Sequence, residues 1–250
     1  MIVASIQARM GSTRLPGKVL ADVCGKPMLL WQVERIRKSR LIDEVVVATT
    51  TSSKDDQIEQ FCIKNKISFY RGSEEDVLKR ISSLIKDFKI NLHLEFCGDT
   101  PLSDPQIIDE FIGYYFKNQK NADFVTSAPK TTYPAGFEIS LYPGDVLIAV
   151  DERVCSDDPL REHVGYNITR FPKLFRTHVL EAPEHFTSPE TYIEVDTVED
   201  LNFIRQLVGY FLEEGKEHFG LAEILTFLKN HPELTEINKN VQRRWKALYS

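Results

Sequence analysis

The first half of this chain alternates short apolar runs with amphipathic stretches, and this alternation restricts the fold more than any other feature of the sequence. Between two apolar runs, for example, Leu29, Val33 and Ile36 recur at helical spacing. The expected strands are Ile2–Ile6, Glu44–Ala48, Ser68–Tyr70, Leu92–Phe96 and Asp123–Thr126. The expected helices are Pro27–Lys38, Asp55–Asn65, Glu74–Lys86 and Asp104–Lys117. Strands that alternate with helices predict an α/β fold with a mostly parallel central sheet and helices on both of its faces.

After residue 128 the pattern changes, because the apolar runs are separated by longer loops. The strands expected there are Phe137–Tyr142, Leu174–Leu180 and Tyr192–Val195, and we interpret them as an antiparallel excursion of the sheet. The C-terminal helices are expected at Thr197–Phe211, Leu221–Lys229 and Asn238–Leu248. Because no linker composition interrupts the 250 residues, we expect one domain that covers 1–250.

Composition excludes several classes of protein. The formal net charge of −6 argues against a nonspecific nucleic-acid binder, although it leaves room for a local basic site. No stretch approaches the roughly 18 consecutive apolar residues of a membrane span. The four cysteines contain no C-x-x-C pair, and without an export signal we expect reduced thiols and a cytoplasmic location.

The loop that follows the first expected strand carries two glycines, two hydroxyl residues and three cations. Such a loop, at the C-terminal end of a parallel strand, is typical of a phosphate site in an α/β sheet. Gly11 allows backbone N–H groups to approach an anion, and Arg9, Arg14 and Lys18 supply positive charge. The sequence therefore predicts a phosphate-binding loop.

This loop matches neither of the common phosphate motifs. Five residues separate Gly11 from Gly17, where a Walker A motif has four, and Lys18 is followed by Val19 instead of Ser or Thr. The G-x-G-x-x-G pattern of dinucleotide-binding folds is also missing.

The run IQARMGSTRLPGKVL resembles the signature of the cytidylyltransferases related to the spore-coat polysaccharide protein SpsF. Related families include the 3-deoxy-octulosonate and acylneuraminate cytidylyltransferases. The resemblance continues, in matching order, through RGSEEDVL, GDTPL, REHV and VDTVEDL, over about the first four-fifths of the chain. It implies a Rossmann-like nucleotidyltransferase fold. The implied activity is transfer of CMP from CTP to an acidic sugar of the 3-deoxy-octulosonate or nonulosonate type, with release of pyrophosphate.

Two aspartates are candidates for binding a metal ion. Asp99 directly follows an expected strand, where a carboxylate can bind Mg²⁺ or simply occupy an ordinary turn. Asp196 closes another expected strand, where it can also cap the following helix, while Asp200 is interpreted as a partner of the helix dipole. The resemblance implies that Asp99 and Asp196 both hold Mg²⁺ (or Mn²⁺).

A second group of residues is expected at the nucleotide. Arg71 follows a strand and precedes a helix, so it can lie against a base or ribose, or belong to a solvated helix start. The resemblance implies a nucleotide site formed by Gln7, Ala8, Arg9, Gly11, Ser12, Thr13, Lys18, Thr49, Arg71, Gly72, Ser73 and Gly98. The catalytic group among all these residues is Arg9, Arg14, Lys18, Asp99 and Asp196.

The acceptor sugar is expected in the second half of the chain. The resemblance places there Tyr133, Gly136, Glu138, Arg161, Glu162 and His163. Arg161 can clamp a sugar carboxylate with two parallel hydrogen bonds, or form a structural Arg–Glu pair on a solvent-facing helix. His163 can accept a proton or be structural. Glu95 and Ser140 depart from the family pattern, which leaves the acceptor open.

The chain thus divides into a nucleotide-binding half (1–128), an acceptor-binding and dimerisation region (129–196) and C-terminal helices (197–250). The expected partners are CTP, a sugar acceptor and a second copy of the chain, without nucleic acid. Two alternatives stay open: a nucleotidyltransferase that makes a CDP- or other NDP-linked product from a phosphorylated acceptor, and a noncatalytic nucleotide-binding protein of a glycan pathway.

Overall fold

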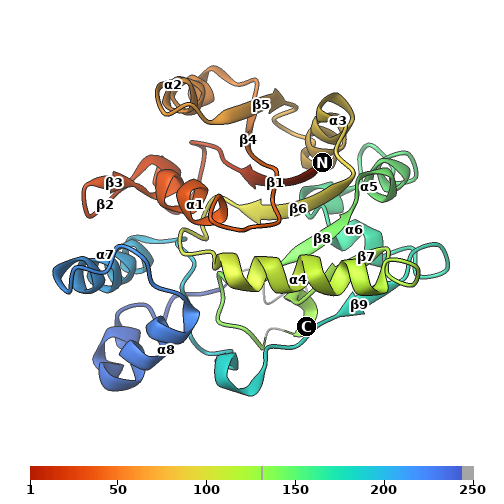
Figure 1. Ribbon diagram of the computed structural model, residues 1–250. Coiled ribbons are helices and arrows are strands. Elements are labelled where there is room, and N and C mark those ends of the chain that lie inside the picture. Colours follow the sequence, from red (N-terminus) through yellow and green to blue (C-terminus); the bar gives the residue numbers. More distant parts are fainter. Residues whose placement is uncertain (131, 244–250) are drawn as a thin grey trace.

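The computed structural model describes residues 1–130 and 132–243 and is built on one seven-stranded sheet (Figure 1). The strand order is β5-β4-β1-β6-β8-β7-β9. The strands are β1 (Ile2–Gln7), β4 (Glu44–Thr50), β5 (Ser68–Gly72), β6 (Leu92–Cys97), β7 (Phe124–Thr126), β8 (Ser140–Pro143) and β9 (Thr177–Val179). A separate two-stranded ribbon pairs β2 (Asp22–Val23) with β3 (Lys26–Pro27).

The parallel half of the sheet confirms the prediction from the sequence. Strand β1 lies between β4 and β6 and pairs with both in parallel, and β5 adds to β4 in the same direction. The interior of β1 is buried, as expected for a strand covered on both faces. As a consequence, the carboxyl ends of β1, β4, β5 and β6 meet at one edge of the sheet, where α/β folds bind their ligands.

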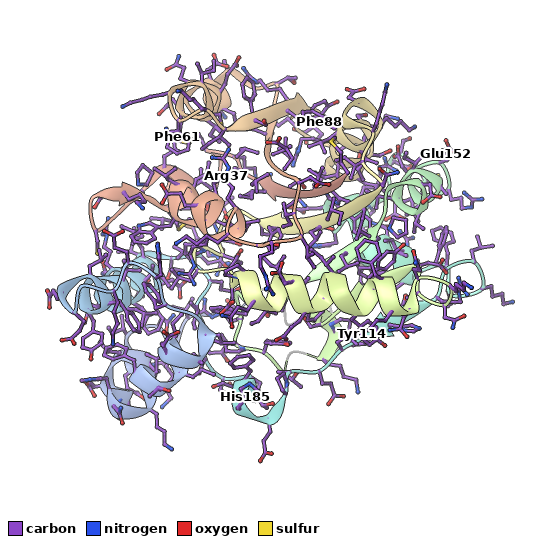
Figure 2. The ribbon with its side chains drawn as sticks, viewed as in Figure 1. Arg37, Phe61, Phe88, Tyr114, Glu152 and His185 are labelled. Carbon is purple, nitrogen blue, oxygen red and sulfur yellow. The ribbon has the colours of Figure 1, made fainter. Side chains whose placement is uncertain are left out.

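Helices cover both faces and give a Rossmann-like arrangement of three layers (Figure 1). The helices packed into the larger apolar cluster are α1 (Met28–Ile36), α2 (Asp56–Lys64), α4 (Pro105–Asn118), α7 (Val198–Glu213) and α8 (Leu221–Asn230). Those on the opposite face are α3 (Val77–Phe88), α5 (Gly144–Asp151) and α6 (Tyr166–Thr169). Figure 2 shows the side chains that fill the space between the sheet and these helices. Of this set, α5 and α6 were not predicted from the sequence.

The second half of the sheet contains the predicted antiparallel excursion. Strand β8 runs antiparallel to both β6 and β7, and β9 is parallel to β7. The expected strand Tyr192–Val195 is wrong, because only an isolated bridge between Tyr192 and Ala135 forms there. The reason is that the backbone amides of this segment bond to two different parts of the chain and not to one neighbouring strand. Ile193 donates to the carbonyl of Ala135, whereas Val195 donates to the carbonyl of Asp99.

The C-terminal part begins with α7, whose Thr197 and Asp200 form the two reciprocal hydrogen bonds of a capping box. After α8, a 3₁₀ helix covers Pro232–Ile237. The helix expected at Asn238–Leu248 is not seen in its described part, since residues 238–240 form a turn and 241–243 are irregular, and residues 244–248 lie outside the described residues. Across the described chain, the helices are all too short or too polar to cross a membrane.

Candidate active site

The predicted phosphate loop leaves the carboxyl end of β1 and is fixed at both of its ends. Ala8 donates to the carbonyl of Ala48 on β4, and Met10 donates to the carboxylate of Asp55 at 2.7 Å. The amide of Gly17 closes the loop on the carbonyl of Met10 at 2.9 Å, with Gly17 in the left-handed region (φ 72°) that favours glycine.

The middle of this loop is open. Gly11 and Thr13 are exposed, Ser12 is half-buried, and no atom lies within 4 Å of a Cβ built on Gly11. An incoming anion can therefore reach the backbone here without displacing a side chain, as the sequence predicted for a phosphate loop.

Lys18 begins the turn after the loop and brings the two predicted aspartates together. Its ammonium donates to Asp99 at 3.0 Å, to Asp196 at 2.9 Å and to the carbonyl of Val195 at 2.7 Å. Burial of Lys18 opposes its charge, but the two carboxylates outweigh that effect and raise the Lys18 pKa above its usual value. Lys18 is therefore held charged at the ligand-binding edge of the sheet.

Arg14 completes this cluster from the other side of Asp196. Its Nη2 pairs with the second carboxylate oxygen of Asp196, and its Nη1 donates to the carbonyl of Gln242 at 2.9 Å. We call Arg14, Lys18, Asp99 and Asp196 the charge cluster. Four of the five residues predicted to be catalytic thus lie in direct contact. The fifth, Arg9, is half-exposed and lies 3.5 Å from the carboxylate of Glu162.

The charge cluster suits a divalent cation that arrives with a nucleotide. In residues 1–130 and 132–243, no group of three or more His, Cys, Asp or Glu side chains is arranged to hold a metal ion. Mg²⁺, however, is commonly bound by one or two carboxylates together with substrate phosphates and water. Asp99 and Asp196, both partly exposed and already converging on one cation, meet that requirement.

The contact between β1 and β6 depends on glycine at position 98. The Gly98 amide donates to the carbonyl of Gln7 at 2.8 Å, and a Cβ at Gly98 would lie only 2.8 Å from that same oxygen. Glycine therefore allows Asp99 to approach the phosphate loop.

The side chain of Gln7 faces Glu95 on β6 rather than the open loop. Glu95 accepts hydrogen bonds from Gln7 (3.0 Å), from the Tyr142 hydroxyl (3.1 Å) and from the Gly165 amide (3.0 Å). Burial raises the pKa of Glu95 to about 7 in spite of these three donors. The residue that departs from the family pattern is thus a carboxyl that joins the nucleotide-binding half to the acceptor region.

Of the residues predicted at the ends of β4 and β5, Gly72 and Ser73 lie against a buried arginine, Arg80. Thr49 is buried, and its hydroxyl is without a hydrogen-bond partner among the described residues. A Cβ at Gly72 would lie 2.7 Å from Cγ of Arg80, and Arg80 donates to the carbonyl of Ser73 at 2.6 Å. Burial, together with the charge of Arg9, lowers the Arg80 pKa.

Arg71 lies on the same edge strand but is occupied by structural contacts. It pairs with Asp56 at 2.8 Å and with Glu59, and it donates to the carbonyls of Thr50 and Ser52, both at 2.8 Å. The structure therefore does not bring Arg71 to the charge cluster. Its ion pairs are with Asp56 and Glu59 of α2 and not with the solvated start of α3.

Among the residues predicted at the acceptor, Glu162 contacts Arg9 of the predicted catalytic group, and Glu138 lies within the electrostatic influence of Asp99. Gly136, at φ 102°, packs against the backbone of Ile193 and donates to the Glu138 carboxylate at 2.8 Å. Burial raises the Glu138 pKa to about 7, and the charge of Asp99 adds to the effect. Tyr133 is buried in the larger apolar cluster, where its ring packs against Phe111.

Arg161 belongs to a buried ion-pair network, and it also lines a cavity of about 340 Å³ together with Arg9, Asp76 and Glu162. Its guanidinium contacts Asp76 at 2.8 Å, pairs with Asp151, and donates to the carbonyl of Val154 at 2.9 Å. Nε, Nη1 and Nη2 are all engaged, so clamping a sugar carboxylate would require Arg161 to exchange some of these partners. The alternative of an Arg–Glu pair on a solvent-facing helix is wrong, because Arg161 is buried and pairs with aspartates. His163 is half-buried, and its amide donates to the carbonyl of Leu160.

Three supporting residues were missed by the sequence reasoning. Asp55 holds the phosphate loop through Met10, Arg80 lies beneath Ser73, and Arg243 pairs with Asp200. A signal existed only for Arg80: it follows the helix cap Asp76 by four residues, a spacing that turns it back toward the start of α3.

The chain is similar to known proteins in sequence and in fold. The sequence model of the family described as "Cytidylyltransferase" matches residues 3–236. The chain is 34% identical over 236 residues to the spore coat polysaccharide biosynthesis protein SpsF of Bacillus subtilis, covering 93% of this chain and 95% of that protein. It is 37% identical over 119 residues to the 3-deoxy-manno-octulosonate cytidylyltransferase of Geobacter sulfurreducens, covering 47% and 46%. A solved cytidylyltransferase structure from Leptospira borgpetersenii superposes with a TM-score of 0.86 at 28% identity, covering 97% and 98%.

Proposed function

This chain belongs to the cytidylyltransferase family, and we propose that it transfers CMP from CTP to an acidic sugar of the 3-deoxy-octulosonate or nonulosonate type, with release of pyrophosphate. The observation that carries the proposal is the ammonium of Lys18 held between Asp99 and Asp196 beside an open phosphate loop. The similarity to a 3-deoxy-manno-octulosonate cytidylyltransferase supports the choice of acceptor, and the similarity to SpsF supports a role in surface polysaccharide synthesis.

The loop and its cations would bind the triphosphate. Gly11, Ser12 and Thr13 offer backbone and hydroxyl donors at the exposed part of the loop. Lys18 and Arg14 would exchange part of their pairing with the aspartates for contacts with phosphate oxygens, which are also anionic acceptors. Positive charge would then face the pyrophosphate as negative charge builds up on it.

The reaction itself requires mainly positioning. An acceptor hydroxyl oxygen attacks the α-phosphorus of CTP in line, a new P–O bond forms, and the bond to the pyrophosphate oxygen breaks. Mg²⁺ held by Asp99 and Asp196 would supply Lewis acidity at the phosphate oxygens. Glu138, with its pKa near 7, would accept a hydrogen bond from the acceptor hydroxyl and take up its proton.

The base would lie at the ends of β4 and β5. Thr49, Gly72 and Ser73 line that part of the edge, and the buried Arg80 adds a cation beneath Ser73. A carboxylate on the acceptor would be met by Arg9, whose contact with Glu162 is long and exposed, because Arg161 is already paired.

The decisive experiment measures pyrophosphate release with CTP, UTP, ATP and GTP against 3-deoxy-keto-acid sugars, sugar phosphates and polyol phosphates. We expect turnover with CTP and a keto-acid sugar, and at least a roughly tenfold preference for CTP in kcat/KM, about 1.4 kcal/mol. Asp99→Asn serves as the inactive control. Turnover only with a phosphorylated acceptor would assign a CDP-linked product instead, and CTP binding without turnover of any acceptor would indicate a noncatalytic protein.

A further inference from the structure

A buried carboxylate, Asp200, lies directly behind the charge cluster. It is fully buried, and its Oδ2 accepts the amides of Asp196 (3.0 Å) and Thr197 (2.9 Å) together with the Thr197 hydroxyl (3.1 Å). Because one of these donors is the backbone of Asp196 itself, any shift of Asp200 moves a member of the charge cluster.

The other oxygen of Asp200 is held from the far end of the chain. We call residues 238–243 the C-terminal clasp. From this clasp, Asn238 donates to Asp200 Oδ1 at 2.9 Å and to the carbonyl of Tyr192 at the same distance. Arg243 donates to Asp200 Oδ1 at 2.8 Å, and its guanidinium carbon lies 4.4 Å from the ring centre of Tyr192. The clasp therefore contacts the chain on both sides of Asp196: Tyr192 in the segment before it and Asp200 in the helix after it.

The clasp also contacts the phosphate loop. The carbonyl of Gln242 accepts from Nη1 of Arg14 at 2.9 Å, while Nη2 of the same guanidinium pairs with Asp196. One short segment of the chain thus fixes two members of the charge cluster, one through Asp200 and one directly.

These contacts exceed what the helix needs for its own stability. The capping box of α7 is complete with Thr197 and Asp200 alone. Burying Arg243, whose side chain is 2% exposed, against a carboxylate adds a desolvation cost that apolar residues of similar volume would avoid. An ion pair with several hydrogen bonds fixes the orientation of the side chains that take part in it, which apolar packing does not do.

We propose that Arg243 is a positioning residue which, through Asp200, sets the Asp196 carboxylate against Lys18 and Arg14, so that the C-terminal clasp controls the affinity of the triphosphate site. This inference rests on the proposed function, since it concerns CTP binding at the same site. The hydrogen-bonding partners of a metal-ligating side chain, the role proposed for Asp196, commonly affect metal affinity or activity by one to two orders of magnitude.

The test compares Arg243→Met, Arg243→Lys and the control Lys239→Met. Lys239 is an exposed residue of the same clasp, and its ammonium pairs with Glu236 at the surface. CTP binding is measured by calorimetry with Mg²⁺ and with EDTA, below the unfolding temperature of each variant. We expect Arg243→Met to weaken CTP roughly tenfold or more, Arg243→Lys to recover part of that loss, and Lys239→Met to bind like the parent. The acceptor KM should change by less than about twofold.

A purely structural role predicts a different result: Arg243→Met would unfold at lower temperature, yet its folded fraction would bind CTP like the parent, and that outcome would overturn the inference. If Arg243→Met does not fold, Asp200→Asn replaces it, because the amide keeps the shape and an acceptor oxygen but removes the charge that holds Arg243. Unchanged CTP affinity in Asp200→Asn would likewise count against the inference. Failure of the parent itself to bind CTP would refute the proposed function instead.

Discussion

Replacement of Lys18 by alanine probes the centre of the charge cluster. The ammonium makes two charge-assisted hydrogen bonds, to Asp99 and Asp196, and a third bond to the carbonyl of Val195. A hydrogen bond to a charged group contributes roughly 1.5–3 kcal/mol. If one such bond is exchanged for a phosphate contact in the CTP complex, Lys18→Ala should lower kcat/KM by that amount, about 10- to 150-fold.

The fold should survive this change. Lys18 lies at the edge of the sheet. Without its ammonium, Asp196 keeps Arg14 as a partner, whereas Asp99 loses its ion pair with Lys18. The measurement is steady-state pyrophosphate release with CTP varied, together with thermal unfolding of each variant. Lys64→Ala is the matched control, because Lys64 is an exposed lysine in the last turn of α2.

The reasoning would be refuted if Lys18→Ala turned over CTP like the parent, since the loop would then bind no phosphate through this residue. A loss in kcat/KM that merely follows a loss of folded protein would equally contradict it. The prediction requires a kinetic defect in a variant that remains folded at the assay temperature, and no comparable defect in Lys64→Ala.

Three further predictions follow from the same structure. EDTA should abolish activity and Mg²⁺ restore it, and Asp99→Asn should bind Mg²⁺–CTP poorly by calorimetry; full activity in EDTA would exclude the proposed metal role. Arg161→Lys should lower the melting temperature and leave the ratio of acceptor KM to CTP KM unchanged, because the partners of Arg161, Asp76 and Asp151, belong to the protein. A selective rise in acceptor KM would instead support the interpretation that Arg161 clamps the sugar carboxylate. The pKa of Glu95 is raised from 4.5 to about 7, so the folded chain keeps a proton that the unfolded chain releases, and the free energy of unfolding should fall as pH rises through this window. Glu95→Gln should lack that part of the fall in denaturant titrations between pH 4.5 and 7.5, and identical pH profiles would argue against a buried, titrating Glu95.

The sequence predicted best those features that are encoded locally. Strands β1 and β4 are mostly apolar, whereas β6 alternates Leu92, Leu94 and Phe96 with His93 and Glu95. Both patterns predict a strand from the local sequence alone. The loop from Arg9 to Lys18 could be predicted because its cations follow a strand end directly, and the ends of parallel strands converge.

The features that escaped prediction depend on contacts distant in sequence. The local sequence accounts for Asp200 as part of a helix cap. Its further partners, Asn238 and Arg243, follow it by 38 and 43 residues. Arg161 offers the same guanidinium to a substrate or to a neighbour, and only the packing of Asp76 and Asp151 around it decides between them. Residue type indicates which contacts are possible, whereas the choice among them requires the fold.

The charge balance of the charge cluster indicates a reason for the presence of two aspartates among the cations proposed to bind phosphate. Arg14 and Lys18 contribute two positive charges, and Asp99 and Asp196 contribute two negative charges, so the cluster is formally neutral. A neutral cluster offers little net attraction to a triphosphate, and Arg9 adds only one exposed charge that salt would screen. If the aspartates served merely to hold the cations in place, they would weaken the binding that those cations provide. If the aspartates bind a divalent cation that arrives with the nucleotide, they contribute to triphosphate binding instead. The divalent cation would then replace Lys18 and Arg14 as the partner of the aspartates, and Lys18 and Arg14 would become available to the phosphates. We therefore interpret the paired aspartates as the residues that make triphosphate binding depend on the metal.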